Sequence, residues 1–246
     1  FINLRLIPQL KTKIKMIDQF VAVIPAAGIG NRFEDQTPKQ YLELKGKSVI
    51  ERSIEHILNH PSCLELVVCL SMDDTWFNEL AISQDPKIKI TLGGKTRGES
   101  VYNGVKFFED KDIEFSHFLI QDAVRPCLEG KDLDKLLELS ETEYDGMILG
   151  FPVSDTLKKL DCKTNQIIET VDRNNLWHSQ TPQLFKKDPL IRALNQATNG
   201  HEFTDEAQLL ESIGANLILV KGSLYNIKLT YQDDLKIIKL MINSGI

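Results

Sequence analysis

The sequence predicts an α/β fold: a Rossmann-like, mostly parallel sheet with helices on both faces and a projecting β-hairpin arm used for dimerisation. Three observations favour this fold. Apolar, β-branched segments alternate with amphipathic helical segments, as a sheet covered on both faces requires. A glycine-containing loop follows the first apolar segment. Residues 152–183 then break the alternation with β-branched and polar residues on either side of a turn-like segment.

The expected elements follow from these patterns in chain order. Strands are expected at 20–24, 65–71, 87–91, 117–121, 146–151 and 216–220. Helices are expected at 48–59, 98–109, 131–142, 186–198, 204–213 and 232–243. Ser48 is the expected N-cap of the first helix, because Glu51 stands at the capping-box position. The second helix follows Gly93-Gly94 directly, so its first N–H groups can face a ligand.

The arm is expected at about 152–183. An isolated two-stranded hairpin is only marginally stable in water, so this one should pack on another surface. The simplest such surface is the same arm of a second subunit, which predicts a homodimer.

Composition limits the classes of function. The chain has 246 residues, enough for one large domain, and a formal charge of −6, which argues against a nucleic-acid or acidic-membrane surface. Its four cysteines form no Cys-x-x-Cys pair, which is typical of reduced thiols in a cytoplasmic protein. No apolar run reaches the about 18–20 residues that cross a bilayer. We expect one domain over 16–246, with 1–15 a non-native or disordered extension.

The loop after the first strand is the most informative segment. Little side-chain bulk is found at four of its positions, Ala26, Ala27, Gly28 and Gly30. A ligand can therefore lie against backbone N–H groups, and the nearby cations Arg32 and Lys39 suit a polyphosphate and the charge that develops in nucleotidyl transfer. The dinucleotide fingerprint would need glycine where Phe33 stands, and a Walker A ending in Gly-Lys-Ser/Thr is absent.

Six motifs, in order over about 210 residues, give the chain a family resemblance. They are Pro-Ala-Ala-Gly-x-Gly-x-Arg with Pro-Lys-Gln-Tyr-Leu, Gly93-Gly94 with Arg97 and Ser100, the segment 122–126, the two sides of the arm at 152–158 and 170–174, the segments 176–183 and 204–207, and 226–230. This set resembles the 2-C-methyl-D-erythritol 4-phosphate cytidylyltransferases. The resemblance implies transfer of CMP from CTP to methylerythritol phosphate, giving CDP-methylerythritol and pyrophosphate, in non-mevalonate isoprenoid biosynthesis.

The resemblance also implies roles for particular residues. It makes Arg32 and Lys39 catalytic, and Asp122 the ligand of Mg²⁺, with Arg125 orienting that segment. It assigns CTP to Ala26, Ala27, Gly28, Gly30, Gly93, Gly94, Arg97 and Ser100. It assigns the second substrate to Asp155, Thr156, Thr181, Thr204 and Lys228, and to Arg173 of the other chain. Two of these residues keep a second interpretation: Arg97 as a structural residue beneath the pocket, and Thr204 as a helix cap.

Three positions depart from the family pattern. Gln121 stands where relatives often have His, Val124 where they have Ala or Gly, and Tyr225 where many have Asp. The nearest alternative function is a ribitol 5-phosphate cytidylyltransferase, which shares the CTP motifs. Broader alternatives are another sugar-phosphate nucleotidyltransferase and a catalytically silent nucleotide-binding module. The silent module predicts loss of Arg32, Lys39 or Asp122, and all three are present.

Overall fold

A computed structural model describes residues 19–28, 37–138, 143–197 and 203–245. The predicted extension at 1–15 and the candidate site residues Gly30 and Arg32 lie outside these residues. Seven strands form the central sheet of the described chain: β1 (Phe20–Pro25), β4 (Cys63–Leu70), β5 (Ile88–Leu92), β6 (His117–Ile120), β7 (Gly146–Pro152), β10 (Trp177–Lys186) and β11 (Leu217–Lys221).

The sheet has the order β11-β7-β10-β6-β1-β4-β5, and all its neighbouring pairs are parallel except the two that involve β10. β1 lies between β4 and β6, and its residues Phe20 to Ile24 are all fully buried. Successive side chains of a strand point to opposite faces. Accordingly Phe20 and Ile24 join the core on one face, while Val21 and Val23 join the core on the other. The α/β fold with a mostly parallel sheet is confirmed.

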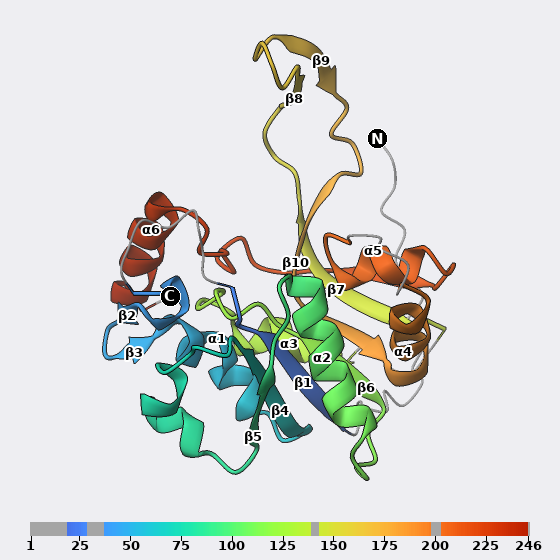
Figure 1. Ribbon diagram of the computed structural model, residues 1–246. Coiled ribbons are helices and arrows are strands. Elements are labelled where there is room, and N and C mark those ends of the chain that lie inside the picture. Colours follow the sequence, from blue (N-terminus) through green and yellow to red (C-terminus); the bar gives the residue numbers. More distant parts are fainter. Residues whose placement is uncertain (1–18, 29–36, 139–142, 198–202, 246) are drawn as a thin grey trace.

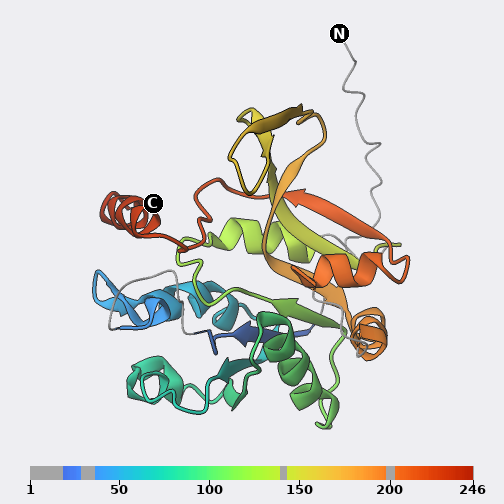
Figure 2. The same ribbon diagram turned by 45° about the horizontal axis from the view of Figure 1, so that its top comes forward.

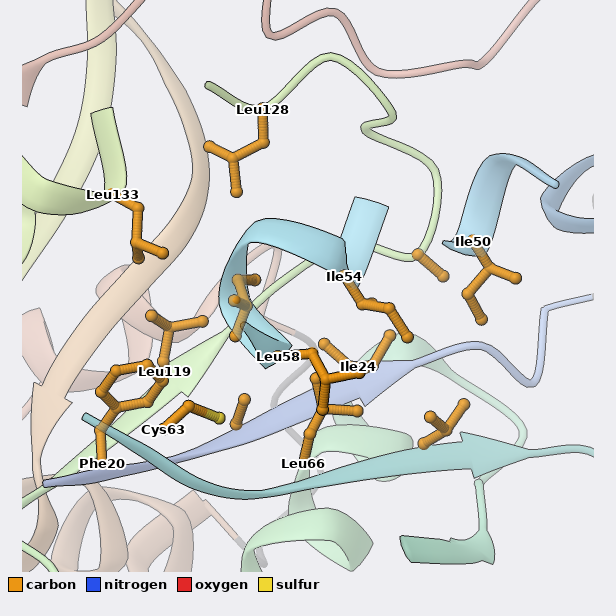
Figure 3. Close-up of a cluster of buried hydrophobic side chains, with 14 of the residues drawn as sticks. Phe20, Ile24, Ile50, Ile54, Leu58, Cys63, Leu66, Leu119, Leu128 and Leu133 are labelled. Atoms are coloured by element: carbon orange, nitrogen blue, oxygen red, sulfur yellow. The ribbon is translucent and has the colours of Figure 1, made fainter. Parts of the chain in front are cut away.

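Helices cover both faces of the sheet (Figures 1 and 2). On one face lie α1 (Val49–Leu58) and α3 (Gly130–Glu138). Figure 3 shows Ile54 and Leu58 of α1 directed at Ile24 and Leu66 of the sheet. The opposite face carries α2 (Arg97–Glu109), α4 (Lys187–Gln196) and α5 (Glu206–Glu211). These helices bury both faces of the sheet, so we expect a ligand to bind at the loops on the carboxyl edge of the sheet.

The remaining elements are small or peripheral. α6 (Gln232–Asn243) packs in a separate apolar cluster that also contains Leu44, Val49 and Leu229. The short elements are β2 (Glu43–Leu44), β3 (Lys47–Ser48) and the 3-10 turns η1 (Lys39–Tyr41), η2 (Phe77–Glu79) and η3 (Ala81–Gln84). The predicted capping box of α1 is present: the Glu51 N–H donates to Ser48 Oγ, and the Ser48 N–H donates to the Glu51 carboxylate. In the described residues no helix is both long and apolar enough to cross a membrane.

The predicted arm is present as the antiparallel hairpin of β8 (Leu157–Leu160) and β9 (Ile167–Val171). It stands away from the body of the molecule at the top of Figure 1. Its apolar residues Leu160, Ile167 and Ile168 are exposed. The predicted span of 152–183 is too long at its end, because residues 177–183 belong to β10, which runs between β6 and β7 in the sheet.

Candidate active site

The described start of the loop after β1, Ala26 to Gly28, is held by backbone and amide hydrogen bonds. The Ala26 N–H donates to the Cys69 carbonyl at 2.9 Å. The buried Gln40 side chain donates to the carbonyls of Ala26 at 3.1 Å and Gly28 at 3.5 Å. These bonds fix the first small residues of the loop at the carboxyl edge of β1, where a ligand can reach them.

The second loop, at Gly93-Gly94, lies directly against the first. A Cβ on Gly93 would stand 2.4 Å from the Cβ of Ala27, so this close approach requires glycine. The Gly94 N–H donates to Ser100 Oγ at 3.0 Å, and that hydroxyl donates to the Thr96 carbonyl at 3.0 Å. Ser100 is buried and therefore fixes the loop to the start of α2.

Asp122 follows β6 and is surrounded by cations. Its Oδ1 lies 3.0 Å from Arg97 Nε, and its Oδ2 lies 3.0 Å from Lys228 Nζ and 3.3 Å from Arg125 Nε. Burial by itself would raise the pKa of Asp122, but the charges of Arg97, Lys228 and Arg125 outweigh it and hold the pKa well below its usual range. The carboxylate is therefore ionised throughout the neutral range.

Glu206 is a site residue that the motif reasoning missed. Arg97 Nη1 lies 2.8 Å and 3.0 Å from its two carboxylate oxygens, so Arg97 bridges Glu206 and Asp122. Burial raises the pKa of Glu206, and the Arg97 charge opposes that rise. The available signal was an acid in the predicted helix start at 204–207. Sequence could not show that Glu206, rather than its neighbour Asp205, faces Arg97.

Arg125 and Thr181 make hydrogen bonds that hold the backbone around Asp122 and Asn226. The Asp122 N–H donates to Thr181 Oγ1 at 3.0 Å. Arg125 Nη1 donates to the Asn226 carbonyl at 2.7 Å, and Asn226 Nδ2 donates to the Thr181 carbonyl at 2.8 Å. Asn226 belongs to the 226–230 motif, but no role was predicted for it. The structure shows that it connects the segment before Lys228 to β10.

Lys39, the first residue of η1, contacts the segment that carries Lys228. Its Nζ donates to the Leu229 carbonyl at 3.1 Å. A pocket of about 170 Å³ opens between these elements. Nine of the predicted site residues line it: Ala26, Ala27, Gly28, Lys39, Gly94, Arg97, Ser100, Asp122 and Lys228. Gln40, Lys95 and Thr96 also line it, although no sequence pattern had singled them out as site residues.

Four predicted substrate residues lie elsewhere in the described chain. Asp155, Thr156 and Arg173 are exposed on the arm, where Arg173 donates to the Ser154 carbonyl. Thr204 Oγ1 donates to Gln208 Oε1 at 3.0 Å, just before α5. Of the described residues that line the pocket, none belongs to the arm.

Comparison with known proteins gives a consistent assignment. The sequence profile of the 2-C-methyl-D-erythritol 4-phosphate cytidylyltransferase family matches residues 20–244. A cytidylyltransferase of that description from Vibrio vulnificus (strain CMCP6) is 41% identical over 230 residues, covering 93% of this chain and 97% of the relative. One from Alteromonas mediterranea is 43% identical over 217 residues, covering 87% of this chain and 89% of the relative.

Solved structures agree with the sequence relatives. A crystal structure of the Francisella tularensis 2-C-methyl-D-erythritol 4-phosphate cytidylyltransferase superposes with a TM-score of 0.77 at 31% identity, covering 90% of this chain and 99% of that one. A 4-diphosphocytidyl-2C-methyl-D-erythritol synthase gives the same TM-score of 0.77 at 36% identity, covering 91% and 98% of the two chains. The protein described here therefore belongs to the 2-C-methyl-D-erythritol 4-phosphate cytidylyltransferase family.

Proposed function

We propose that this protein transfers CMP from CTP to 2-C-methyl-D-erythritol 4-phosphate, releasing CDP-methylerythritol and pyrophosphate. The observation that carries the proposal is the pocket lined by Lys39, Arg97 and Lys228, the last two of which contact Asp122, beside two loops of small residues. Among the described residues that line this pocket, cations outnumber carboxylates, although the whole chain has a formal charge of −6. The pocket thus suits two anionic substrates, and family membership identifies them.

The reaction is an in-line displacement at phosphorus. A phosphate oxygen of the second substrate forms a bond to the α-phosphorus of CTP, and the bond from that phosphorus to the bridging oxygen of pyrophosphate breaks. The nucleophile is already an anion near neutral pH, so no general base is required. The protein has to hold two anions together and stabilise the charge that gathers on the α-phosphate oxygens. We assign that task to Lys39 and, from sequence, to Arg32.

The CTP site is assigned to the two small-residue loops. Backbone groups at Ala26, Ala27 and Gly94 can read the edge of cytosine and so select CTP among the nucleotides. Ser100 and Gly93 hold the second loop in place. Arg97 combines both roles considered from sequence: it lines the pocket and also bridges two buried carboxylates.

The donor chemistry fits a magnesium ion. Asp122 is the acidic residue among the described residues that line the pocket, and its lowered pKa keeps it ionised. Mg²⁺ at nucleotide sites takes one or two carboxylates, with phosphate oxygens and waters as its other ligands. Bound there, the ion would neutralise phosphate charge on CTP. By the family resemblance, Tyr225 stands where many relatives have Asp, so this site is expected to bind Mg²⁺ more weakly than theirs.

Asp122→Asn is expected to raise the Mg²⁺ concentration for half-maximal activity by about tenfold or more, because the amide cannot replace an ionic ligand. The change also leaves Arg97, Arg125 and Lys228 without their shared anion, so thermal stability should fall as well. Mg²⁺ titrations well below the melting temperature separate the two effects. An unchanged titration in folded Asp122→Asn protein would remove Asp122 from the metal site.

The second substrate site is proposed to be shared between two subunits. Thr181 and Lys228 lie beside Asp122, whereas Asp155, Thr156 and Arg173 lie on the projecting arm of the same chain. An arm with exposed Leu160, Ile167 and Ile168 can bury them against the arm of a second subunit. The partner's arm residues would then close the pocket over the substrate phosphate. Asp155 and Thr156 are proposed to bind the hydroxyl groups of the substrate, and Thr204 is proposed as an additional substrate contact.

Substrate choice is tested by pyrophosphate release. With Mg²⁺ and CTP, kcat/KM for methylerythritol phosphate should exceed that for ribitol 5-phosphate by on the order of 10²-fold, as expected when a shaped pocket selects one polyol. Assays with ATP, GTP and UTP in place of CTP serve as controls. Equal or faster turnover with ribitol 5-phosphate would transfer the assignment to that cytidylyltransferase family.

A further inference from the structure

Tyr41 makes a buried hydrogen bond next to the proposed catalytic lysine. It is the last residue of η1, which begins at Lys39 and also contains Gln40. Its phenol oxygen donates to Asp74 Oδ2 at 2.6 Å, and its side chain is almost fully buried. Neither Tyr41 nor Asp74 is among the residues that line the pocket. Their contact can therefore act on the site only through the backbone segments that carry them, η1 and the loop after β4.

Asp74 is itself held rigidly in the loop that follows β4. Its Oδ1 accepts the N–H groups of Trp76 and Phe77, both at 3.1 Å. Phe77 is fully buried in the core. The Trp76 ring stacks on the Tyr41 ring, with centroids 6.0 Å apart and planes 15° from parallel. Asp74 Oδ1 thus holds the loop, and Asp74 Oδ2 accepts the hydrogen bond from Tyr41.

The end of β4 also holds both nucleotide loops. The Cys69 carbonyl accepts the Ala26 N–H at 2.9 Å, and the Leu70 carbonyl accepts the Gly93 N–H at 2.7 Å. Gln40, also in η1, donates a hydrogen bond from its side chain to the Ala26 carbonyl of the first nucleotide loop. The turn that carries Lys39 is therefore tied to the nucleotide loop by Gln40 and to the β4 exit loop by Tyr41.

We infer that Tyr41 and Asp74 are positioning residues that set the direction from which Lys39 reaches the substrate phosphates. The inference rests on the proposed role of Lys39. A lysine is a point charge on a flexible stem, so the placement of its backbone decides where the ammonium group can go. Burial and then the hydrogen bond to Asp74 raise the pKa of Tyr41, which keeps the phenol a donor across the assay range. A small misplacement of a catalytic group is sufficient to slow transfer strongly.

Tyr41→Phe tests the inference, because it removes the hydroxyl and keeps the ring that stacks on Trp76. We expect kcat to fall about tenfold, with KM for CTP changed less than about threefold, since the nucleotide loops keep their own bonds. Asp74→Asn, which perturbs the same bond from the other side, should give a similar loss. In a Lys39→Ala background, Tyr41→Phe should produce no further loss, because its effect passes through Lys39. Tyr102→Phe on α2 is the matched control and should leave kcat unchanged.

The outcomes separate this inference from the function on which it rests. If Lys39→Ala is itself nearly as fast as the unaltered protein, the proposed role of Lys39 fails. If Lys39→Ala is slow but Tyr41→Phe and Asp74→Asn both lower only the melting temperature and leave kcat intact, the contact is structural and the positioning role is overturned. A full tenfold loss for Tyr41→Phe on top of Lys39→Ala would also overturn it, because the effect would not depend on Lys39.

Discussion

Lys39→Met is expected to lower kcat by on the order of 10²–10³ while the protein stays folded, as for loss of a preorganised transition-state donor. Methionine keeps most of the length and the apolar stem of lysine but has no charge. Lys39 lines the pocket, and its Nζ donates to the Leu229 carbonyl, so we expect the ammonium group to need little rearrangement to meet a phosphate. KM for CTP should change much less than kcat. Arg32→Met is expected to behave in the same way.

Steady-state pyrophosphate release, together with a melting curve, checks this expectation. Lys39→Arg should recover only part of the activity, because a planar guanidinium cannot occupy the position of a compact ammonium group. Lys89→Met is a suitable control, since Lys89 lies on the edge strand β5, pairs with Glu65 of β4 and is not among the described residues that line the pocket. Near-normal kcat in folded Lys39→Met protein would show that Lys39 is a loop cation with no catalytic role.

Much of the fold could be predicted because the local patterns agree with the tertiary structure. The run from Phe20 to Ile24 is apolar and β-branched, and it forms the fully buried β1. The helices were predicted from the periodicity of their apolar residues. The Ser48 N-cap was predicted because its side chain bonds within its own turn. In each case the signal lies within a few consecutive residues, so no distant contact is needed to interpret it.

β10 could not be predicted because the middle of the strand is mostly polar. Gln180, Thr181 and Gln183 are buried there, and their burial depends on partners distant in sequence. Gln180 Nε2 donates to the carbonyls of Ser223 and Asn226, and Gln183 Nε2 donates to Ser179 and Asp205. A strand stabilised by such contacts lacks the apolar alternation that identifies strands, so the segment was assigned to the arm.

The site shows the same division between local and distant signals. The small residues of the first loop, and the sequence around Lys39, predicted a phosphate-binding pocket that Ala26, Ala27, Gly28 and Lys39 do line. The partner of Arg97 could not be predicted in this way, because Glu206 is 109 positions further along the chain. Only the packing of α5 on the α2 face of the sheet brings its first residue to Arg97.

The proposed composite site leads to a complementation test with a large expected change. If each pocket combines Lys39 of one subunit with Arg173 of its partner, Lys39→Ala and Arg173→Ala homodimers should both be nearly inactive. In a mixed dimer, one pocket receives both intact residues and the other receives neither. When the two variants are unfolded and refolded together in equal amounts, about half the dimers should be mixed, which restores about a quarter of full activity.

The structure supplies a control for that experiment, because Lys39 and Lys228 line the same pocket within one chain. Lys39→Ala refolded with Lys228→Ala therefore leaves one defect in each pocket of a mixed dimer, and activity should not return. Recovery in the Arg173 mixture but not in the Lys228 mixture would require a residue from the partner at each site. Mass spectrometry must show mixed dimers in both samples. If mixed dimers form and neither mixture recovers, Arg173 does not act across subunits, and the exposed arm needs another explanation than a shared substrate site.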